Sequence, residues 1–366
     1  MEEKQRLTGI DLFRGITVYA VIVIHTEHQA SIPGSWAAKL VQFSLFAVPF
    51  FLATSFYLAI NSLHTKRAKF SLKVRLTRLL IPYSVWSVIY LSKTVAEYIF
   101  KYLILNQPLE SVSIFQDPVN IIFFGGAAYH LYFLAILFPG TILIKFAEYL
   151  INKRNKIHVL FLLFGISISI YNLILVSGNS FQLATGTAFQ GFLNVALIDG
   201  NKNPLLRVVL VELSWIIRCT PYIFMAMILN HSVIKEYFIN FSANSTLLFC
   251  IFFVFNSFGS SFFPEAVYEF GRGYFALLFA ISLSFELKEN SVIKNISFCS
   301  FGIYLIHLLV VHVFQSIAKK LFPGSETMAV TLMPLVISSC CSFIVSWMIT
   351  SLLVKKKSIS KLMFGV

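Results

Sequence analysis

The feature that most constrains this chain is a series of apolar stretches about 20 residues long, since that is the length of a helix that crosses a bilayer. We predict ten such spans in the 366-residue sequence. They cover roughly residues 10–26, 40–62, 79–103, 131–151, 157–177, 204–230, 243–263, 266–285, 297–318 and 328–354. The sequence therefore predicts an all-α polytopic membrane protein with about ten transmembrane helices.

The composition excludes an ordinary soluble domain. Hydrophobic residues make up 57% of the chain and charged residues only 12%, and the mean hydropathy is +0.79. This is too little charge to cover a water-exposed surface. The first span lacks a small-residue cleavage site, so we predict a retained helix. The cysteines lie in apolar stretches without metal-ligand spacing, and we expect packing roles and no metal site. They are Cys219, Cys250, Cys299, Cys340 and Cys341.

The net charge of +13 is explained by membrane topology. Lysine and arginine gather in the connections after the second, fourth, sixth and eighth spans and in the C-terminal tail. Basic residues are retained on the cytoplasmic side of a membrane. We therefore predict a multi-pass protein of the plasma membrane with both termini in the cytoplasm. We expect no nucleic-acid partner.

Ionisable residues mark the first span, where His25 follows Arg14 by eleven positions, with ten residues between them. At about 1.5 Å per residue they share one helix face, roughly 16 Å apart along the axis. Ionisable groups inside a span are costly and usually functional. The alternative is an arginine that reaches the membrane surface and a hydrogen-bonded core histidine.

A second basic element precedes the third span. Arg75 and Arg78 are spaced i, i+3 and share a helix face shortly before Pro82 and Tyr83. Two guanidinium groups in this arrangement can bind a phosphate through paired hydrogen bonds. The alternative is that their charge only sets the topology.

Three later elements carry further polar residues. The fourth span opens with His130-Leu131-Tyr132-Phe133-Leu134, for which an aromatic belt at the membrane surface is the alternative. Arg218 lies near the middle of the sixth span, with Glu212 as one candidate partner. In the ninth span a polar stripe runs along one face, formed by Ser300, Tyr304 and His307. The alternative is a helix–helix seam, whose hydrogen bonds contribute roughly 0.6 kcal/mol each.

Taken in order, these elements resemble the signatures of the acyltransferase 3 family of integral membrane acyltransferases. The first span matches an arginine and a histidine separated by ten residues, and the later elements resemble the family's R-x-x-R, His-Leu-Trp-Phe-Leu and Ser-x-x-x-Tyr-Leu-x-His patterns. Two positions depart from it: Tyr132 replaces the usual tryptophan, and Ala226 or Met227 stands where a glycine is expected after Arg218. The resemblance implies one membrane acyltransferase domain over residues 1–366.

The resemblance also implies a reaction. An acyl group, most commonly acetyl, passes from cytoplasmic acyl-coenzyme A to a hydroxyl of an extracytoplasmic or lipid-linked carbohydrate. His25 is the expected general base, or the carrier of an acyl-histidine intermediate, and Arg14 is expected to be a catalytic residue beside it. Arg14, Arg75 and Arg78 are expected to bind the coenzyme A phosphates, and Asp11 to orient Arg14. Acceptor-binding or orienting roles are expected for Glu27, His130, Tyr132, Arg218, Ser300, Tyr304 and His307.

Acyl-coenzyme A enters this scheme as a donor substrate, and we expect no tightly bound cofactor. The expected partners are the lipid bilayer, the donor and a surface or lipid-linked glycan, and self-association is left open. A rival hypothesis is a transporter or exporter of a polysaccharide or its precursor, without catalysis, because buried polar groups also mark transport pathways. The inverted repeats with broken helices that often mark such proteins are not evident in the sequence.

Overall fold

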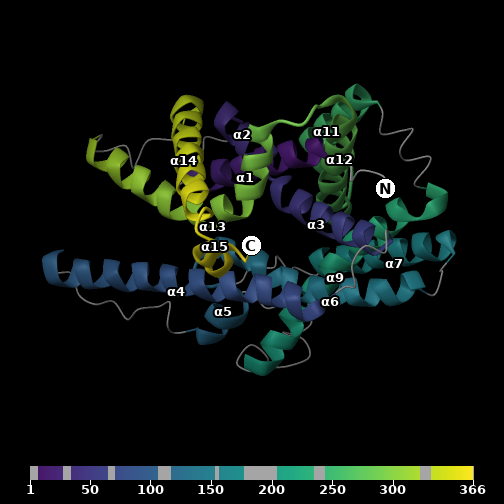
Figure 1. The fold of residues 1–366 in the computed structure, drawn as a ribbon, viewed down its shortest axis with the longest axis horizontal. Coiled ribbons are helices and arrows are strands. Elements are labelled where there is room, and N and C mark those ends of the chain that lie inside the picture. The colour runs from purple at the N-terminus through teal and green to yellow at the C-terminus, as the bar shows by residue number, and fades with distance from the viewer. Residues whose placement is uncertain are drawn as a thin grey trace. The chain divides into compact units, whose positions relative to one another are not determined.

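The fold is described from a computed structural model of the chain, which describes residues 7–27, 34–64, 71–105, 117–152, 156–176, 204–234, 244–321 and 331–365. Within these ranges the regular elements are all helices (Figure 1). They are α1 Thr8–Thr26, α2 Trp36–Ser44, α3 Ala47–His64, α4 Leu72–Leu105, α5 Pro118–Phe123, η2 Tyr129–Leu131, α6 Tyr132–Asn152, α7 Ile157–Val176, α9 Pro204–Asn230, α11 Ser245–Phe258, η4 Gly259–Ser261, α12 Glu265–Glu286, α13 Ser291–Leu321, α14 Leu332–Leu353 and α15 Lys357–Phe364.

Nine helical segments in the described part of the chain are long and apolar enough to cross a membrane. Nine of the ten predicted spans correspond to them. The protein is thus an all-α polytopic membrane protein, as the sequence predicts. The remaining predicted span, 243–263, is shorter than expected: α11 ends at Phe258, and only the 3₁₀ turn η4 follows.

Two further boundaries differ from the prediction. The predicted span 40–62 is formed by two helices, α2 and α3, which are separated at Leu45 and Phe46. Pro49 lies in the first turn of α3 and has no N–H to bond the carbonyl four residues earlier, so a continuous helix is interrupted there. The predicted span 79–103 begins earlier, at Leu72. Arg75 and Arg78 therefore lie within the first two turns of α4 and not in a loop before it.

The chain divides into two compact units. The first unit comprises Met1–Tyr57 and His231–Ser360, and the second comprises Leu58–Asn230 and Lys361–Val366. The unit boundaries fall within α3 and α15. Each unit is described by itself below.

In the first unit α1 packs against α12, α13 and α14 (Figure 1, where α1 is purple and α14 is yellow). The contact with α12 depends on Gly9. A Cβ at this position would collide with the carbonyl oxygen of Ala280, and the Gly9 N–H donates to the Ser284 hydroxyl at 3.0 Å. Phe13 is buried among aromatic rings of α3, α11 and α12. These contacts fix the position and rotation of α1.

Helix α14 has the polarity expected of a helix in lipid. Its fully buried face carries four hydroxyl side chains, spaced three or four residues apart: Ser339, Ser342, Ser346 and Thr350. Its exposed face carries large apolar side chains, including Ile337, Ile344 and Met348. A soluble helix would bury the second group and expose the first. Small polar residues at helix contacts and apolar residues toward the surroundings are typical of membrane bundles.

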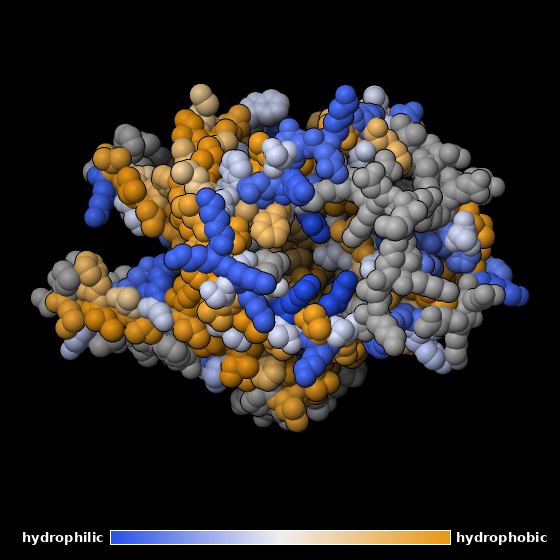
Figure 2. Space-filling model, in the orientation of Figure 1, coloured by the Kyte–Doolittle hydropathy of each residue, from blue (hydrophilic) through white to orange (hydrophobic). Residues whose placement is uncertain are grey.

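The second unit is built from α4, α6, α7 and α9, which pack in the pairs α4–α6, α6–α9 and α7–α9. Its largest fully buried side chains include Trp86, Tyr171, Trp215 and Tyr222. The outer surface of α4 is apolar, with Val88, Ile99, Phe100 and Leu103 all exposed (Figure 2). An exposed hydrophobic surface of this length requires a lipid environment.

Candidate functional site

The candidate site in the first unit is centred on two stacked imidazole rings. His25, in the last turn of α1, lies against His307 of α13, with ring centroids 5.2 Å apart and ring planes inclined by 24°. His307 is fully buried and His25 is half-buried. The His25 ring therefore faces α13, inside the helix packing of this unit.

The polar stripe predicted along α13 is buried. Ser300, Tyr304 and His307 are 7%, 5% and 0% exposed. The Nδ1 atom of His307 lies 2.6 Å from the Tyr304 carbonyl oxygen. A carbonyl only accepts, so Nδ1 carries the proton of this bond and Nε2 of the neutral ring is the acceptor nitrogen. The backbone thus sets the tautomer and the orientation of the ring beside His25.

Asp11 and Ser297 connect the start of α1 to the start of the stripe. The Ser297 hydroxyl donates to Oδ1 of Asp11 at 2.5 Å, and the Ser300 hydroxyl donates to the Ser297 carbonyl at 2.8 Å. Asp11 is 8% exposed and Ser297 is 4% exposed. A buried hydrogen bond to a carboxylate is stronger than a neutral one, and it fixes the alignment of the two helices near Arg14.

Arg14 and Glu27 occupy the two ends of the same helix. Arg14 is half-buried and lies one turn after Asp11, and Glu27 is the C-cap of α1. Near His25, the Gln315 side chain donates to the Thr26 carbonyl oxygen at 3.4 Å. His312 lies on α13 five residues after His307. The stripe on α13 therefore continues beyond His307 toward the end of α1.

In the second unit, Arg75 is half-buried and Arg78 is exposed on the first turns of α4. Each lies on the same helix as Pro82 and Tyr83. The C-terminal residues pack against this segment, since a Cβ on Gly365 would collide with the Arg78 carbonyl, and Trp86 Nε1 donates to the Met363 carbonyl at 2.9 Å. These contacts hold the start of α4.

Tyr83 determines the turn that leads into the His130 element. Its hydroxyl donates to the carbonyls of Ile121 and Ile122 and accepts from the Gly125 N–H, each at 3.0 Å. Gly125 has φ +81°, and a Cβ there would lie 2.5 Å from the Tyr132 nitrogen. Only glycine adopts this backbone at low cost. Two motifs that are far apart in the sequence are thus connected through one hydroxyl.

His130 lies in the short helix η2 and is 1% exposed. Two aromatic rings meet it edge-on: Tyr90 at 5.1 Å and 77°, and Tyr129 at 6.2 Å and 80°. Tyr132 is half-buried and begins α6. The environment of His130 is thus largely aromatic, whereas His25 lies against another imidazole.

Arg218 is 9% exposed near the middle of α9. Glu212, its predicted partner, is half-buried on the same helix and forms no ion pair among the described residues. The structure therefore does not pair these two residues. It does pair Arg207 of α9 with Asp117, the N-cap of α5, at 2.6 Å.

Sequence reasoning missed several residues at these sites. Ser297 lies three residues before Ser300, so the helical period already places it on the predicted stripe. His312 and Gln315 continue the same helix and carried a weaker signal, because no recognised pattern includes them. The role of Tyr83 had no local signal, since its three partners come from residues 121–125.

The two imidazoles give the first site groups that can accept and donate protons. Imidazole is the side chain best suited to accept and return a proton near neutral pH, and the His25 ring is oriented by a neighbour whose own tautomer is set by the backbone. In comparisons with known proteins, no curated protein and no solved structure matches the chain. The family model for the acyltransferase 3 domain, described as an acyltransferase domain, matches residues 7–351. This chain therefore belongs to the acyltransferase 3 family and is a multi-pass membrane acyltransferase.

Proposed function

We propose that the protein is an O-acyltransferase of the bacterial inner membrane that moves an acetyl group from cytoplasmic acetyl-coenzyme A to a hydroxyl of an extracytoplasmic or lipid-linked carbohydrate. The observation that supports this best is the stacking of His25 on His307 within the packing of α1 and α13. Two imidazolium rings 5.2 Å apart would repel each other by about 3 kcal/mol at an effective dielectric of 20. Protonation of both rings is therefore disfavoured, so at least one of the two imidazoles is neutral, which is the form a general base requires.

In the proposed step, His25 accepts the proton of the acceptor hydroxyl while that oxygen bonds to the thioester carbonyl carbon. The carbon–sulfur bond then breaks, and the thiolate of coenzyme A takes the proton from His25 as it leaves. The imidazole returns to its neutral form after each transfer, so the step needs no oxidant, reductant or net proton.

Binding of the donor is assigned to three arginines. Arg75 and Arg78 are one turn apart on α4, an arrangement in which both guanidinium groups can hydrogen-bond phosphate oxygens. Arg14, one turn after the Asp11–Ser297 hydrogen bond, begins the His25 face of α1. Roles in orienting the acceptor are assigned to Glu27, His130, Tyr132, Arg218, Ser300, Tyr304 and His307.

The central experiment measures acetyl transfer from radiolabelled acetyl-coenzyme A in membranes that contain His25→Ala protein. We expect a loss of about 10²–10⁴-fold, the usual contribution of a general base. His158→Ala is the matched control, because His158 is exposed on α7 and has no assigned role. Unchanged transfer by folded His25→Ala protein would exclude the proposed base. Movement of an intact glycan across the membrane, with no acetyl transfer by the unaltered protein, would identify a transporter instead.

Donor binding is tested separately with Arg75→Ala and Arg78→Ala. Each substitution should raise the KM for acetyl-coenzyme A by about 10–100-fold, since a hydrogen bond to a charged group contributes about 1.5–3 kcal/mol. The effect should fall away when acetyl pantetheine, which lacks the nucleotide, replaces acetyl-coenzyme A. Lys73→Ala, a neighbouring exposed cation, is the control for a general effect of charge.

A further inference from the structure

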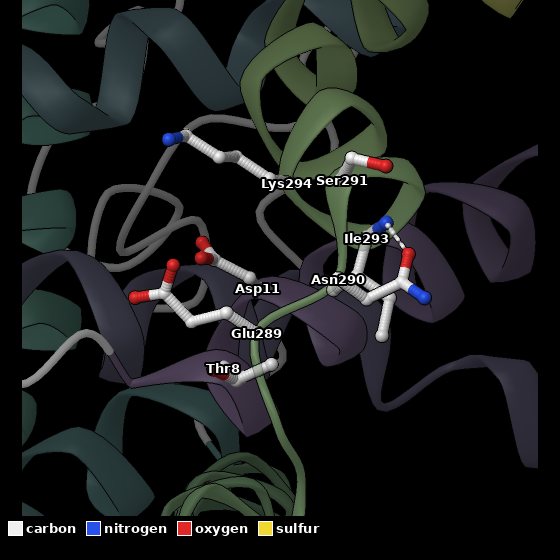
Figure 3. A pocket seen from close by; sticks show the side chains of 7 residues that line it. All are labelled: Thr8, Asp11, Glu289, Asn290, Ser291, Ile293 and Lys294. Atoms are coloured by element: carbon white, nitrogen blue, oxygen red, sulfur yellow. Dashed lines mark hydrogen bonds between the residues drawn. The ribbon is translucent and has the colours of Figure 1, made fainter.

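A polar pocket lies at the connection between α12 and α13 in the first unit (Figure 3). Its volume is about 220 Å³, and it is lined by Thr8, Asp11, Glu289, Asn290, Ser291, Ile293 and Lys294. Glu289 and Lys294 are exposed, and neither side chain forms an ion pair or hydrogen bond among the described residues. Glu289 and Lys294 thus give the pocket one charge of each sign that forms no ion pair among the described residues.

The three charged side chains extend toward the same side of the pocket in Figure 3. Asp11 and Glu289 supply carboxylates, and Lys294 supplies an ammonium group one turn into α13. The Asn290 side chain caps this helix, accepting from the Val292 N–H at 2.8 Å and the Ile293 N–H at 3.2 Å. A ligand with one cationic and one anionic group would meet a partner for each.

An apolar groove adjoins this pocket. It has a volume of about 250 Å³ and shares two lining residues with the pocket, Asp11 and Ile293. Its other lining residues are Leu12, Gly15, Ile16, Tyr19, Ile296 and Phe343. The groove thus extends along α1 beside α13 and α14, with the polar pocket at its end.

The groove lies on the opposite side of α1 from the candidate catalytic face. At about 100° per residue, Ile16 is roughly 200° and Tyr19 roughly 140° from Arg14 around the helix axis. His25 is within roughly 20° of Arg14 on the same reckoning. The groove residues Ile16 and Tyr19 therefore lie on a different face of α1 from Arg14 and His25, and Asp11 is shared between the groove and the residues named for acyl transfer.

We propose that this pocket and groove bind a zwitterionic phospholipid that carries a primary ammonium, namely phosphatidylethanolamine. The carboxylate of Glu289 receives the ammonium, and Lys294 binds the phosphate. One acyl chain lies in the groove between Ile16, Tyr19 and Phe343. The position agrees with this occupant, because connections between spans lie at the membrane surface, where lipid headgroups are found.

The charges favour this lipid over two common alternatives. Phosphatidylglycerol has no cation for the Glu289 carboxylate, and it would place its anion beside it. Phosphatidylcholine has a cation, but its trimethylammonium group has no N–H to donate to a carboxylate. A charge-assisted hydrogen bond of this kind contributes enough for a difference of about tenfold or more in affinity.

The test is native mass spectrometry of the full-length protein in detergent, with dioleoyl phosphatidylethanolamine, phosphatidylcholine and phosphatidylglycerol added in separate titrations. We expect the protein to retain phosphatidylethanolamine about tenfold more strongly than the other two lipids. Glu289→Lys and Ile16→Trp should each remove this preference, the first by reversing a charge of the pocket and the second by filling the groove. Both positions are exposed, so the substitutions leave the packed core intact.

Two controls make the outcome decisive. Lys320→Glu changes a charge at the other end of α13, and His25→Ala removes the proposed base. Both variants should retain phosphatidylethanolamine as the unaltered protein does. Equal retention of all three lipids, stronger retention of phosphatidylglycerol, or unchanged retention by Glu289→Lys would each overturn the proposal. Because His25→Ala serves as a binding control, failure of the lipid site and failure of the proposed acyl transfer are distinguishable.

Discussion

His25 and His130 show how differently two histidines of one chain are held. His25 is half-buried and stacks on His307, whose tautomer is set by a backbone carbonyl. His130 is almost fully buried and meets the edges of Tyr90 and Tyr129. The first environment suits a ring that exchanges a proton with a substrate. The second environment restricts access to the ring, and it suits a residue that orients its surroundings.

The largest expected effect compares the two histidines directly through phenylalanine substitutions. Phenylalanine retains a flat ring at each site but has no nitrogen that could accept a proton. We expect His25→Phe to lower acyl transfer by about 10²–10⁴-fold and His130→Phe by only about tenfold. The measurement is acetyl transfer in membranes, normalised to folded protein. Equal losses in the two variants would remove the distinction between a base and an orienting residue.

The second prediction concerns the turn that precedes His130. Gly125→Ala places a side chain in a left-handed backbone and against the Tyr132 nitrogen, so it should lower the free energy of unfolding by roughly 2–5 kcal/mol. Gly34→Ala is the matched control: its φ is +80°, but a Cβ there would meet nothing within 4 Å. It should cost only about 1–2 kcal/mol. Thermal unfolding in detergent measures both, and similar losses would mean that the close approach to Tyr132 has no effect.

The third prediction concerns the start of the His25 helix. Asp11→Ala, Ser297→Ala and the double variant form a thermodynamic cycle. We expect a coupling energy of about 1.5–3 kcal/mol, because the bond between them is buried and involves a carboxylate. Additive losses would show that the two side chains act independently, and the alignment of α1 with α13 would then depend on apolar packing alone.

The smallest expected effect is that of the ion pair near the His130 turn. Arg207→Ala removes a contact between side chains that are 15% and 31% exposed. Exposed pairs contribute about 0–1 kcal/mol, so the unfolding midpoint should move little compared with that of Gly125→Ala. A loss as large as that of Gly125→Ala would show that Asp117 and Arg207, and not the backbone of Gly125, determine the turn.

The sequence predicted the polar stripe of α13 correctly because its spacing is local. Ser300, Tyr304 and His307 follow the helical period, and a helix buried in a bundle turns such a stripe inward. The same reasoning failed for Glu212 and Arg218. They share a helix, but at about 100° per residue their spacing of six positions places the two side chains roughly 120° apart around its axis.

Helix boundaries were predicted less well where a proline interrupts an apolar stretch. The predicted span 40–62 reads as one hydrophobic stretch, yet Pro49 removes the hydrogen bond that would continue α2 into α3. Hydropathy measures transfer into lipid and does not register a missing N–H. Hydropathy also missed the early start of α4, because the charged residues around Arg75 lower the hydropathy of a segment that is nevertheless helical.

The sequence alone determined that this protein is a bundle of membrane helices of the acyltransferase 3 family, because hydropathy and motif spacing are properties of consecutive residues. Tertiary structure alone decided that His25 stacks on His307, that Asp11 bonds Ser297, and that Tyr83 holds the turn before His130. The Tyr83–Gly125 and Asp11–Ser297 contacts join residues that are 42 and 286 positions apart in the sequence. The His25–His307 contact joins two separate helices, α1 and α13. Their geometry follows from the rotation and depth of each packed helix, which no local pattern specifies.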